Sequence, residues 1–202
     1  MDKNMLSKGY GNDMVKKEIE VLKLFVDRIE RLLRSRLTQH ILQHQIGCKI
    51  FWEEGKNIKI EYPQCDEDDC YSFILSLRFF IQNNDEISIE KISNLIERLP
   101  LSNQIKEPFK HNREELSRYL DSPPFCMAFG EPKSYRDLFN TFIYGDLAHL
   151  NENLRSVYSR WLKDPLVWPH MQTQFFMVLQ NFLLCLSAFR NVALMAIEEL
   201  ER

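Results

Sequence analysis

A repeating row of apolar residues near the N-terminus most constrains how this chain can fold. Its members recur at alternating spacings of four and three, which is the pattern of a helix seam: Val15, Ile19, Leu22, Val26, Ile29 and Leu33. Leu37 and Ile41 continue the stripe, so we expect one long helix over residues 12–46, ended by Gly47. An exposed seam of this length is an association surface. The helix must therefore pack against another long helix or against a second copy of the chain.

The C-terminal part of the chain supplies a segment that can be such a partner. No charged residue lies between Met171 and Phe189, which raises the question of a membrane span. Several amides and a hydroxyl interrupt the segment, and they favour a buried helix: Gln172, Thr173, Gln174, Gln180 and Asn181. We therefore predict a long last helix from about His170 to Glu201 and no contact with a membrane.

The remaining segments predict a mostly helical fold with one short β-structure. Glycine (6) and proline (8) are scarce, which favours helices. Apolar and other residues alternate on either side of Gly55, which predicts a hairpin over residues 49–62. Ser88 and Ser134 stand where helix caps are expected. The fold class is therefore mainly α, a helical bundle with long first and last helices and one small β-hairpin.

The same patterns define the domain organisation. Residues 1–11 lack periodicity, and we expect a flexible tail there. Residues 12–202 then form a single helical domain. We divide this domain into the long helix over residues 12–46, the hairpin over residues 49–62 and a helical core over residues 66–202.

Charge and cysteine content limit the classes of partner. Lys and Arg (26) nearly balance Asp and Glu (29), and the net charge is −3, so no global basic field exists to hold nucleic acid. A local basic patch remains possible at Arg28, Arg31, Arg34 and Arg36, although acidic neighbours equally allow a solvated face. Five cysteines and no secretory signal at the start indicate a reduced, cytoplasmic protein. No cofactor is predicted.

The segment Tyr135–Asn151 carries the main candidate site, a polar pocket near a helix end. No catalytic motif is complete, so no catalytic residue is assigned. Gly145 lets the backbone turn, and the loop Asp121–Lys133 is expected to border the pocket as a lid. A histidine oriented by Asp or Asn can act as a general base, or it can cap a helix end. The residues expected in this pocket are His149, Arg136, Tyr144, Asn151 and Arg78.

Two further observations concern single side chains in helices. Arg78 lies within a very apolar run, so we expect it to be buried and paired with a carboxylate. Arg36, His40 and His44 are spaced four apart and form a weaker candidate site on one helix face. Two histidines at this spacing can share a metal ion. No third ligand follows from the sequence, so no metal is predicted.

The second half of the chain resembles uncharacterised bacterial helical proteins related to the HEPN superfamily and to abortive-infection proteins. The similar stretches are FILSLRFFIQ, ISIEKISNLIERL, YRDLFNTFIYGDLAHLN and the aromatic last helix, within residues 66–202. The family's arginine–histidine spacing is matched by Arg34 and His40 on the first helix, and Arg190 in the last helix has no histidine after it. The resemblance implies a phage-defence or toxin–antitoxin setting.

Two functions follow from these observations. The first is a cytoplasmic helical interaction protein without classical catalysis, which self-associates through its helix seam and contacts a protein or RNA partner. The alternative, which the resemblance implies, is a metal-independent HEPN-type ribonuclease with His149 or His40 as its acid–base group.

Overall fold

The structure, a computed structural model, describes residues 3–43, 49–52, 58–61, 66–81, 87–122, 134–144, 151–166 and 168–202. Most of these residues are helical, which confirms a mainly α fold. The elements in chain order are α1 (Lys3–Arg34), α2 (Arg36–Leu42), β1 (Lys49–Trp52), β2 (Ile58–Glu61), α3 (Glu67–Ile81), α4 (Ile89–Arg98), α5 (Asn103–Asp121), α6 (Tyr135–Tyr144), α7 (Glu152–Lys163) and α8 (Trp168–Leu200).

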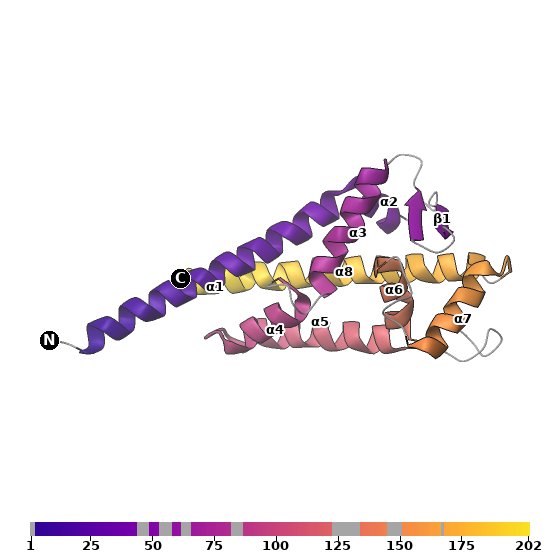
Figure 1. The fold of residues 1–202 in the computed structure, drawn as a ribbon. Helices are drawn as coiled ribbons and strands as arrows, with labels where there is room; N and C mark the ends of the chain where they lie inside the picture. Colours follow the sequence, from indigo (N-terminus) through magenta and orange to yellow (C-terminus); the bar gives the residue numbers. More distant parts are fainter. Residues whose placement is uncertain are drawn as a thin grey trace.

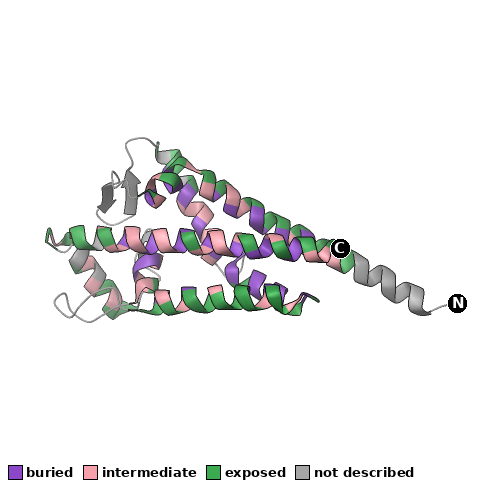
Figure 2. Ribbon diagram, turned by 180° about the vertical axis from the view of Figure 1, so that it is seen from behind, coloured by how far each residue is buried: buried purple, intermediate pink, exposed green. Residues whose placement is uncertain are grey.

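Helix α8 is the central element, and α1 and α5 flank it on either side (Figures 1 and 2). Contacts with α1 show an antiparallel pair, because Lys23 meets Glu201 whereas the later residue Glu30 meets Arg190. Helix α5 also runs antiparallel to α8, because Phe109 packs against Phe189 (ring centroids 4.9 Å apart) whereas the later residue Tyr119 meets Asn181. The short helices α2, α6 and α7 contact α8 as well, so most of the bundle is assembled on one helix.

The core follows the inner face of α8. Its largest fully buried side chains are phenylalanines from five helices, joined by leucines and an isoleucine of α1 and α2: Phe25, Phe80, Phe109, Phe139, Phe175, Phe182, Phe189, Leu22, Ile29 and Leu37. Each buried phenylalanine or leucine contributes about 1.5–3 kcal/mol through removal of apolar surface from water. The bundle is therefore held together mainly by aromatic packing around α8.

The predicted seam is the buried face of α1. Leu22 and Ile29 are fully buried, and Ile19 and Val26 are nearly so. Towards the end of the helix the buried face moves from Leu33 to its neighbour Leu32. The first and last helices thus pack together within one chain, as expected. The seam is used inside the molecule, so self-association, which stays a prediction, needs a different surface.

The single helix expected over residues 12–46 is wrong at Ser35, where the chain divides into α1 and α2. Ser35 is extended (φ −62°, ψ 144°) and caps α2, because its hydroxyl accepts a hydrogen bond from the Thr38 N–H at 3.2 Å. The Thr38 hydroxyl donates to the Leu32 carbonyl at 2.6 Å and satisfies the end of α1. Helix α2 ends at Leu42, and the expected stop at Gly47 lies outside the described residues.

Helix α1 begins at Lys3, so residues 3–11 of the expected tail are helical, whereas their flexibility stays a prediction. This segment contains no proline, and each of its glycines costs a helix only about 1 kcal/mol. Extending a helix that has already formed is much easier than starting one, so the stable part of α1 carries the helix towards the N-terminus. The early residues project beyond the bundle in Figure 1.

Two short strands follow α2. β1 and β2 pair antiparallel, with Lys49 opposite Glu61 and Trp52 opposite Ile58. The residues between the strands, including Gly55, lie outside the described part of the chain. β2 also contacts α3, which places the pair beside the start of the helical core.

Side-chain caps fix where the later helices begin. Ser88 is fully buried, and its hydroxyl accepts from the Lys91 N–H at 3.3 Å, while its neighbours Ile87 and Ile92 are buried around it. Ser134 caps α6 by accepting from the Asp137 N–H at 3.2 Å. Both caps were predicted from the sequence, and both are confirmed.

Helix α8 also satisfies a test for membrane-spanning helices. Within the described residues one stretch, Gln172–Leu200, is long and apolar enough to cross a membrane, and 44% of its most apolar window is buried. This is weak evidence, because the core helix of a soluble protein passes the same test. The position of α8 between α1 and α5 accounts for its apolar composition.

Candidate functional site

The structure places Arg136, a residue of the expected polar pocket, in a contact between α5 and α6. Its Nε donates to Asp121 Oδ1 at 2.9 Å, and its Nη2 lies 3.5 Å from the Ser117 hydroxyl. The hydrogen bond from Arg136 holds the pKa of the Asp121 carboxyl below its ordinary value. Arg136 therefore joins two helices at the molecular surface.

The other expected pocket residues have separate positions. Arg78 is half-buried, and its Nε donates to the Ile143 carbonyl at 2.9 Å, at the end of α6 opposite to Arg136. Asn151 is exposed and caps α7 by accepting from the Leu154 N–H at 3.0 Å. His149 and the side chain of Tyr144 lie outside the described residues, as do residues 123–133 of the expected lid.

A cavity of about 410 Å³ lies where α1 ends, α2 begins and α3 passes both. It is lined by Arg31, Leu32, Ser35, Arg36, Leu37, Asp69, Ser72, Phe73 and Ser76. Binding sites for small molecules have volumes of about 300–1,000 Å³, so this one can hold a ligand of nucleotide size. The break at Ser35 positions the cavity, because it turns the chain away from the axis of α1.

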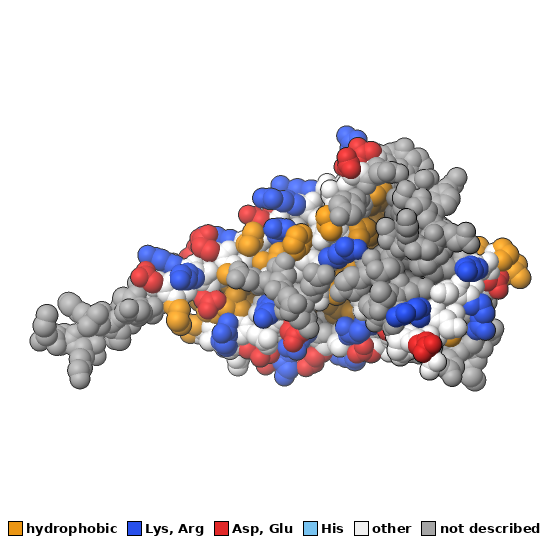
Figure 3. Space-filling model, in the orientation of Figure 1, with side chains coloured by type: hydrophobic (Ala, Val, Ile, Leu, Met, Phe, Trp, Pro, Cys, Tyr) orange, Lys and Arg blue, Asp and Glu red, His pale blue; other side chains and the backbone are white. Residues whose placement is uncertain are grey.

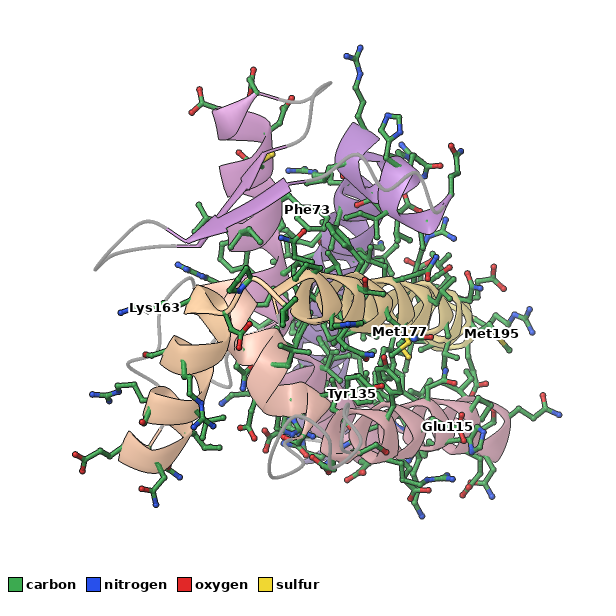
Figure 4. The ribbon with its side chains drawn as sticks, turned by 90° about the vertical axis from the view of Figure 1, so that its right-hand side faces the viewer. Phe73, Glu115, Tyr135, Lys163, Met177 and Met195 are labelled. Atoms are coloured by element: carbon green, nitrogen blue, oxygen red, sulfur yellow. The ribbon has the colours of Figure 1, made fainter. Side chains whose placement is uncertain are left out.

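The floor of the cavity is apolar. Leu32 and Leu37 come from either side of the helix break, and Phe73 comes from α3; all three are buried. Figure 4 shows Phe73 on the side of α3 that faces α2. An apolar floor of this kind supports the planar or hydrocarbon part of a ligand, while polar groups at the rim orient it.

The four arginines of the predicted basic patch separate into two pairs. Arg28 lies over the Phe79 ring, 4.5 Å from its centroid, and Arg34 Nη2 contacts Glu30 Oε2 at 3.2 Å. Arg31 and Arg36 both line the cavity and are exposed. Among the described residues, no contact engages either of these two guanidinium groups, so both can bind a ligand.

The wall formed by α3 carries groups of a different kind. Asp69, Ser72 and Ser76 are spaced along one face of the helix. The Ser76 hydroxyl donates to the Ser72 carbonyl at 2.8 Å. Within the described part of the chain, the Asp69 carboxylate and the Ser72 hydroxyl make no such contact. With respect to the described residues, α1 and α2 therefore contribute the unpaired cations Arg31 and Arg36 to the cavity, and α3 contributes the unpaired Asp69 carboxylate and Ser72 hydroxyl.

This arrangement suits a ligand that carries an anion at one end and hydrogen-bond donors at the other. Guanidinium groups bind phosphate through two parallel N–H bonds. A ligand that is anionic throughout gains from Arg31 and Arg36 but is repelled by Asp69. Figure 3 shows blue and red side chains interspersed along α1 and α5, so the visible face has no extended basic surface.

The weaker candidate site is only partly described. Arg36 lines the cavity, His40 is half-buried one turn further along α2, and His44 lies outside the described residues. No group of three or more metal-binding side chains occurs in the part of the chain that the structure describes. Arg34 and His40 fall on different helices, because the break at Ser35 separates them.

Sequence reasoning did not identify the α3 wall. The acids at the start of α3 favour a helix N-terminus, and Asp66 accepts from the Asp69 N–H at 2.8 Å. The available signal was the polar row formed by Asp69, Ser72 and Ser76 within an otherwise apolar helix. The sequence does not show that this row lines the same cavity as Arg31 and Arg36.

Comparison of the chain with protein-family models, with curated proteins and with solved structures finds no match. The HEPN-like resemblance stays a prediction, and the function is argued from the cavity.

Proposed function

We propose that this protein is a helical binding protein without classical catalysis, and that its cavity between α1, α2 and α3 holds a nucleotide. The nucleotide is either free or one unit of a single-stranded RNA, since both present the same phosphate and base. The observation that carries this proposal is a pair of exposed arginines, Arg31 and Arg36, which no described residue engages and which line a cavity of about 410 Å³ with an apolar floor.

The charges around the cavity support a phosphate ligand. Glu30 is the acidic residue nearest in sequence to Arg31, and it is bound by Arg190 and Arg34. The hydrogen bond from Arg190 lowers the pKa of Glu30, so it remains a carboxylate held by these partners. Its charge is compensated, which leaves Arg31 and Arg36 to attract an anion.

We place this binding in the cytoplasm as part of the same proposal. Cys185 forms no disulfide within the described residues, in keeping with a reducing compartment. A cytoplasmic RNA- or nucleotide-binding protein also suits the phage-defence or toxin–antitoxin setting that the resemblance implies.

The proposal is tested by fluorescence anisotropy with a labelled single-stranded RNA, and by calorimetry with nucleoside monophosphates. The variant Arg31→Ala/Arg36→Ala should weaken binding of the ligand by at least about tenfold, because both cations that contact the phosphate are removed. The salt dependence of binding should fall as well. If the protein binds the RNA but no monophosphate, the ligand is single-stranded RNA. If it binds monophosphates tightly, the ligand is a free nucleotide.

The matched control is Lys16→Ala/Lys17→Ala, which removes two exposed cations from the same helix at positions that do not line the cavity. Equal losses in both double variants would contradict a cavity site and indicate only general charge attraction. The same RNA incubated with a chelator tests the alternative function, since cleavage under that condition would favour a metal-independent ribonuclease.

A further inference from the structure

The two walls of the cavity differ in chemistry, and this difference points to the base of the bound nucleotide. Arg31 and Arg36 come from α1 and α2, whereas Asp69 and Ser72 come from α3. A phosphate has no favourable position beside Asp69. If the phosphate contacts the arginines, the other end of the nucleotide meets the α3 wall.

A carboxylate is a hydrogen-bond acceptor with two oxygens, and it favours a base that presents N–H donors. Guanine presents the N1–H and the 2-amino group side by side, so one carboxylate can accept both. Uracil presents a single N–H between two carbonyl oxygens, which a carboxylate repels. Hypoxanthine keeps the N1–H of guanine but lacks the 2-amino group.

We propose that Asp69 makes this site selective for guanine nucleotides by accepting hydrogen bonds from the N1–H and the 2-amino group. This inference rests on the nucleotide-binding function proposed above. The apolar floor formed by Leu32, Leu37 and Phe73 supports the flat face of the base, and the free Ser72 hydroxyl lies on the same wall as the carboxylate.

Asp69 is suited to this role because its carboxylate makes no hydrogen bond or ion pair with the described residues. Its contact with Asp66 is made through its backbone N–H, which any residue at this position retains. The substitution Asp69→Asn keeps the size of the side chain, and it replaces one acceptor oxygen by an NH₂ donor. Guanine binding should suffer while the helix remains intact.

The experiment measures dissociation constants of GMP, IMP and UMP by calorimetry for the wild type, Asp69→Asn and Asp68→Asn. Asp68 is an exposed neighbour of Asp69 that does not line the cavity. The wild type and Asp68→Asn should bind GMP about tenfold more tightly than IMP and UMP, as expected for a two-bond contact to a base edge. Asp69→Asn should lose this preference, with its melting temperature unchanged.

The outcomes separate the two proposals. Equal binding of all three nucleotides by the wild type would overturn guanine selectivity and leave nucleotide binding in place. A GMP preference that survives Asp69→Asn would overturn the role of Asp69. No binding of any nucleotide, whether free or as the guanine, inosine or uracil forms of a short RNA, would overturn both proposals.

Discussion

Single side chains set the helix boundaries in this molecule, and Ser88 shows how much one hydroxyl contributes. Ser88 is fully buried and caps α4 through the Lys91 N–H. Ser88→Ala should lower the free energy of unfolding by about 1–2 kcal/mol, because the N–H loses its partner and water cannot replace it. Urea denaturation measures this loss. Ser156→Ala, at an exposed position in α7, is the control and should change stability by no more than about 0.5 kcal/mol.

A second residue-scale contact makes stability depend on pH. The Glu199 carboxylate accepts from the Ser102 hydroxyl at 2.7 Å and from the Ser102 N–H at 2.5 Å, and these bonds lower its pKa. A lowered pKa stabilises the fold above the ordinary glutamate pKa, and the stabilisation is lost as the pH falls through the folded-state value. On acidification, the free energy of unfolding of the wild type should therefore fall towards that of Glu199→Gln.

Urea midpoints of the wild type and Glu199→Gln, measured near pH 7 and about pH 3, provide the test. The two proteins should differ near neutrality and draw closer in acid, as the wild-type carboxyl becomes protonated. Glu198→Gln is the control, since Glu198 is exposed and lies outside these hydrogen bonds. Curves for Glu199→Gln and the wild type that stay parallel across the range would contradict the assignment.

At the scale of the element, the short helix α2 depends on α8. The Gln180 side-chain N–H₂ lies 3.4 Å from both the Ile41 and the Leu42 carbonyl, so α8 supplies donors to the C-terminal end of α2. Gln180→Ala should loosen α2 without unfolding the bundle, because seven residues do not make a stable helix alone.

Hydrogen exchange followed by mass spectrometry measures this effect. Peptides covering α2 should exchange at least about tenfold faster in Gln180→Ala, while those covering α5 stay unchanged. Leu184→Ala serves as the control, because Leu184 lies one turn further along α8 and is 55% exposed. Equal exchange of α2 in the variant and the wild type would show that the side chain of Gln180 is not needed there.

The sequence predicted the elements better than it predicted their breaks. Periodicity identified the buried face of α1, the uncharged segment Met171–Phe189 identified α8 as a buried helix, and the caps of α4 and α6 followed from Ser88 and Ser134. The break at Ser35 could not be seen in the apolar stripe of Leu33, Leu37 and Ile41. The interruption is only one residue long, so the helical spacing of apolar residues continues across it. Local hydrogen bonds of Ser35 and Thr38 decided the matter, and these depend on tertiary packing.

The candidate site was less accessible to sequence reasoning than the fold. Arg31 and Arg36 were recognised within a basic patch, but the patch alone did not show that Arg28 contacts Phe79 and Arg34 contacts Glu30. Asp69 lies more than thirty residues further along the chain, as the printed numbering shows. Arg31, Arg36 and Asp69 line one cavity only because α3 passes the break at Ser35.

At the scale of the whole molecule, the α1 seam belongs to the interior of one chain. Leu22 is fully buried against the bundle, whereas Leu24 is 43% exposed on the same helix. Leu22→Ala should therefore lower the free energy of unfolding by about 2–5 kcal/mol. It should not change the oligomeric state, because the seam is covered within the chain.

Sedimentation velocity and urea denaturation, performed over a range of protein concentrations, test this prediction. Leu24→Ala is the matched control and should leave stability nearly unchanged. Dissociation of an oligomer by Leu22→Ala would contradict an intrachain seam. Dissociation by Leu24→Ala would instead locate a self-association surface on the exposed side of α1.

The central place of α8 has a consequence for how the protein is made. A ribosome synthesises residues 168–200 after every other helix described in the structure, yet α1, α2, α5, α6 and α7 all pack against this helix. Until α8 leaves the exit tunnel, α1 and α5 lack the helix that each contacts most extensively, and the apolar surface that α8 covers stays exposed to solvent and to chaperones. The nascent chain must therefore wait for α8 before this bundle can close.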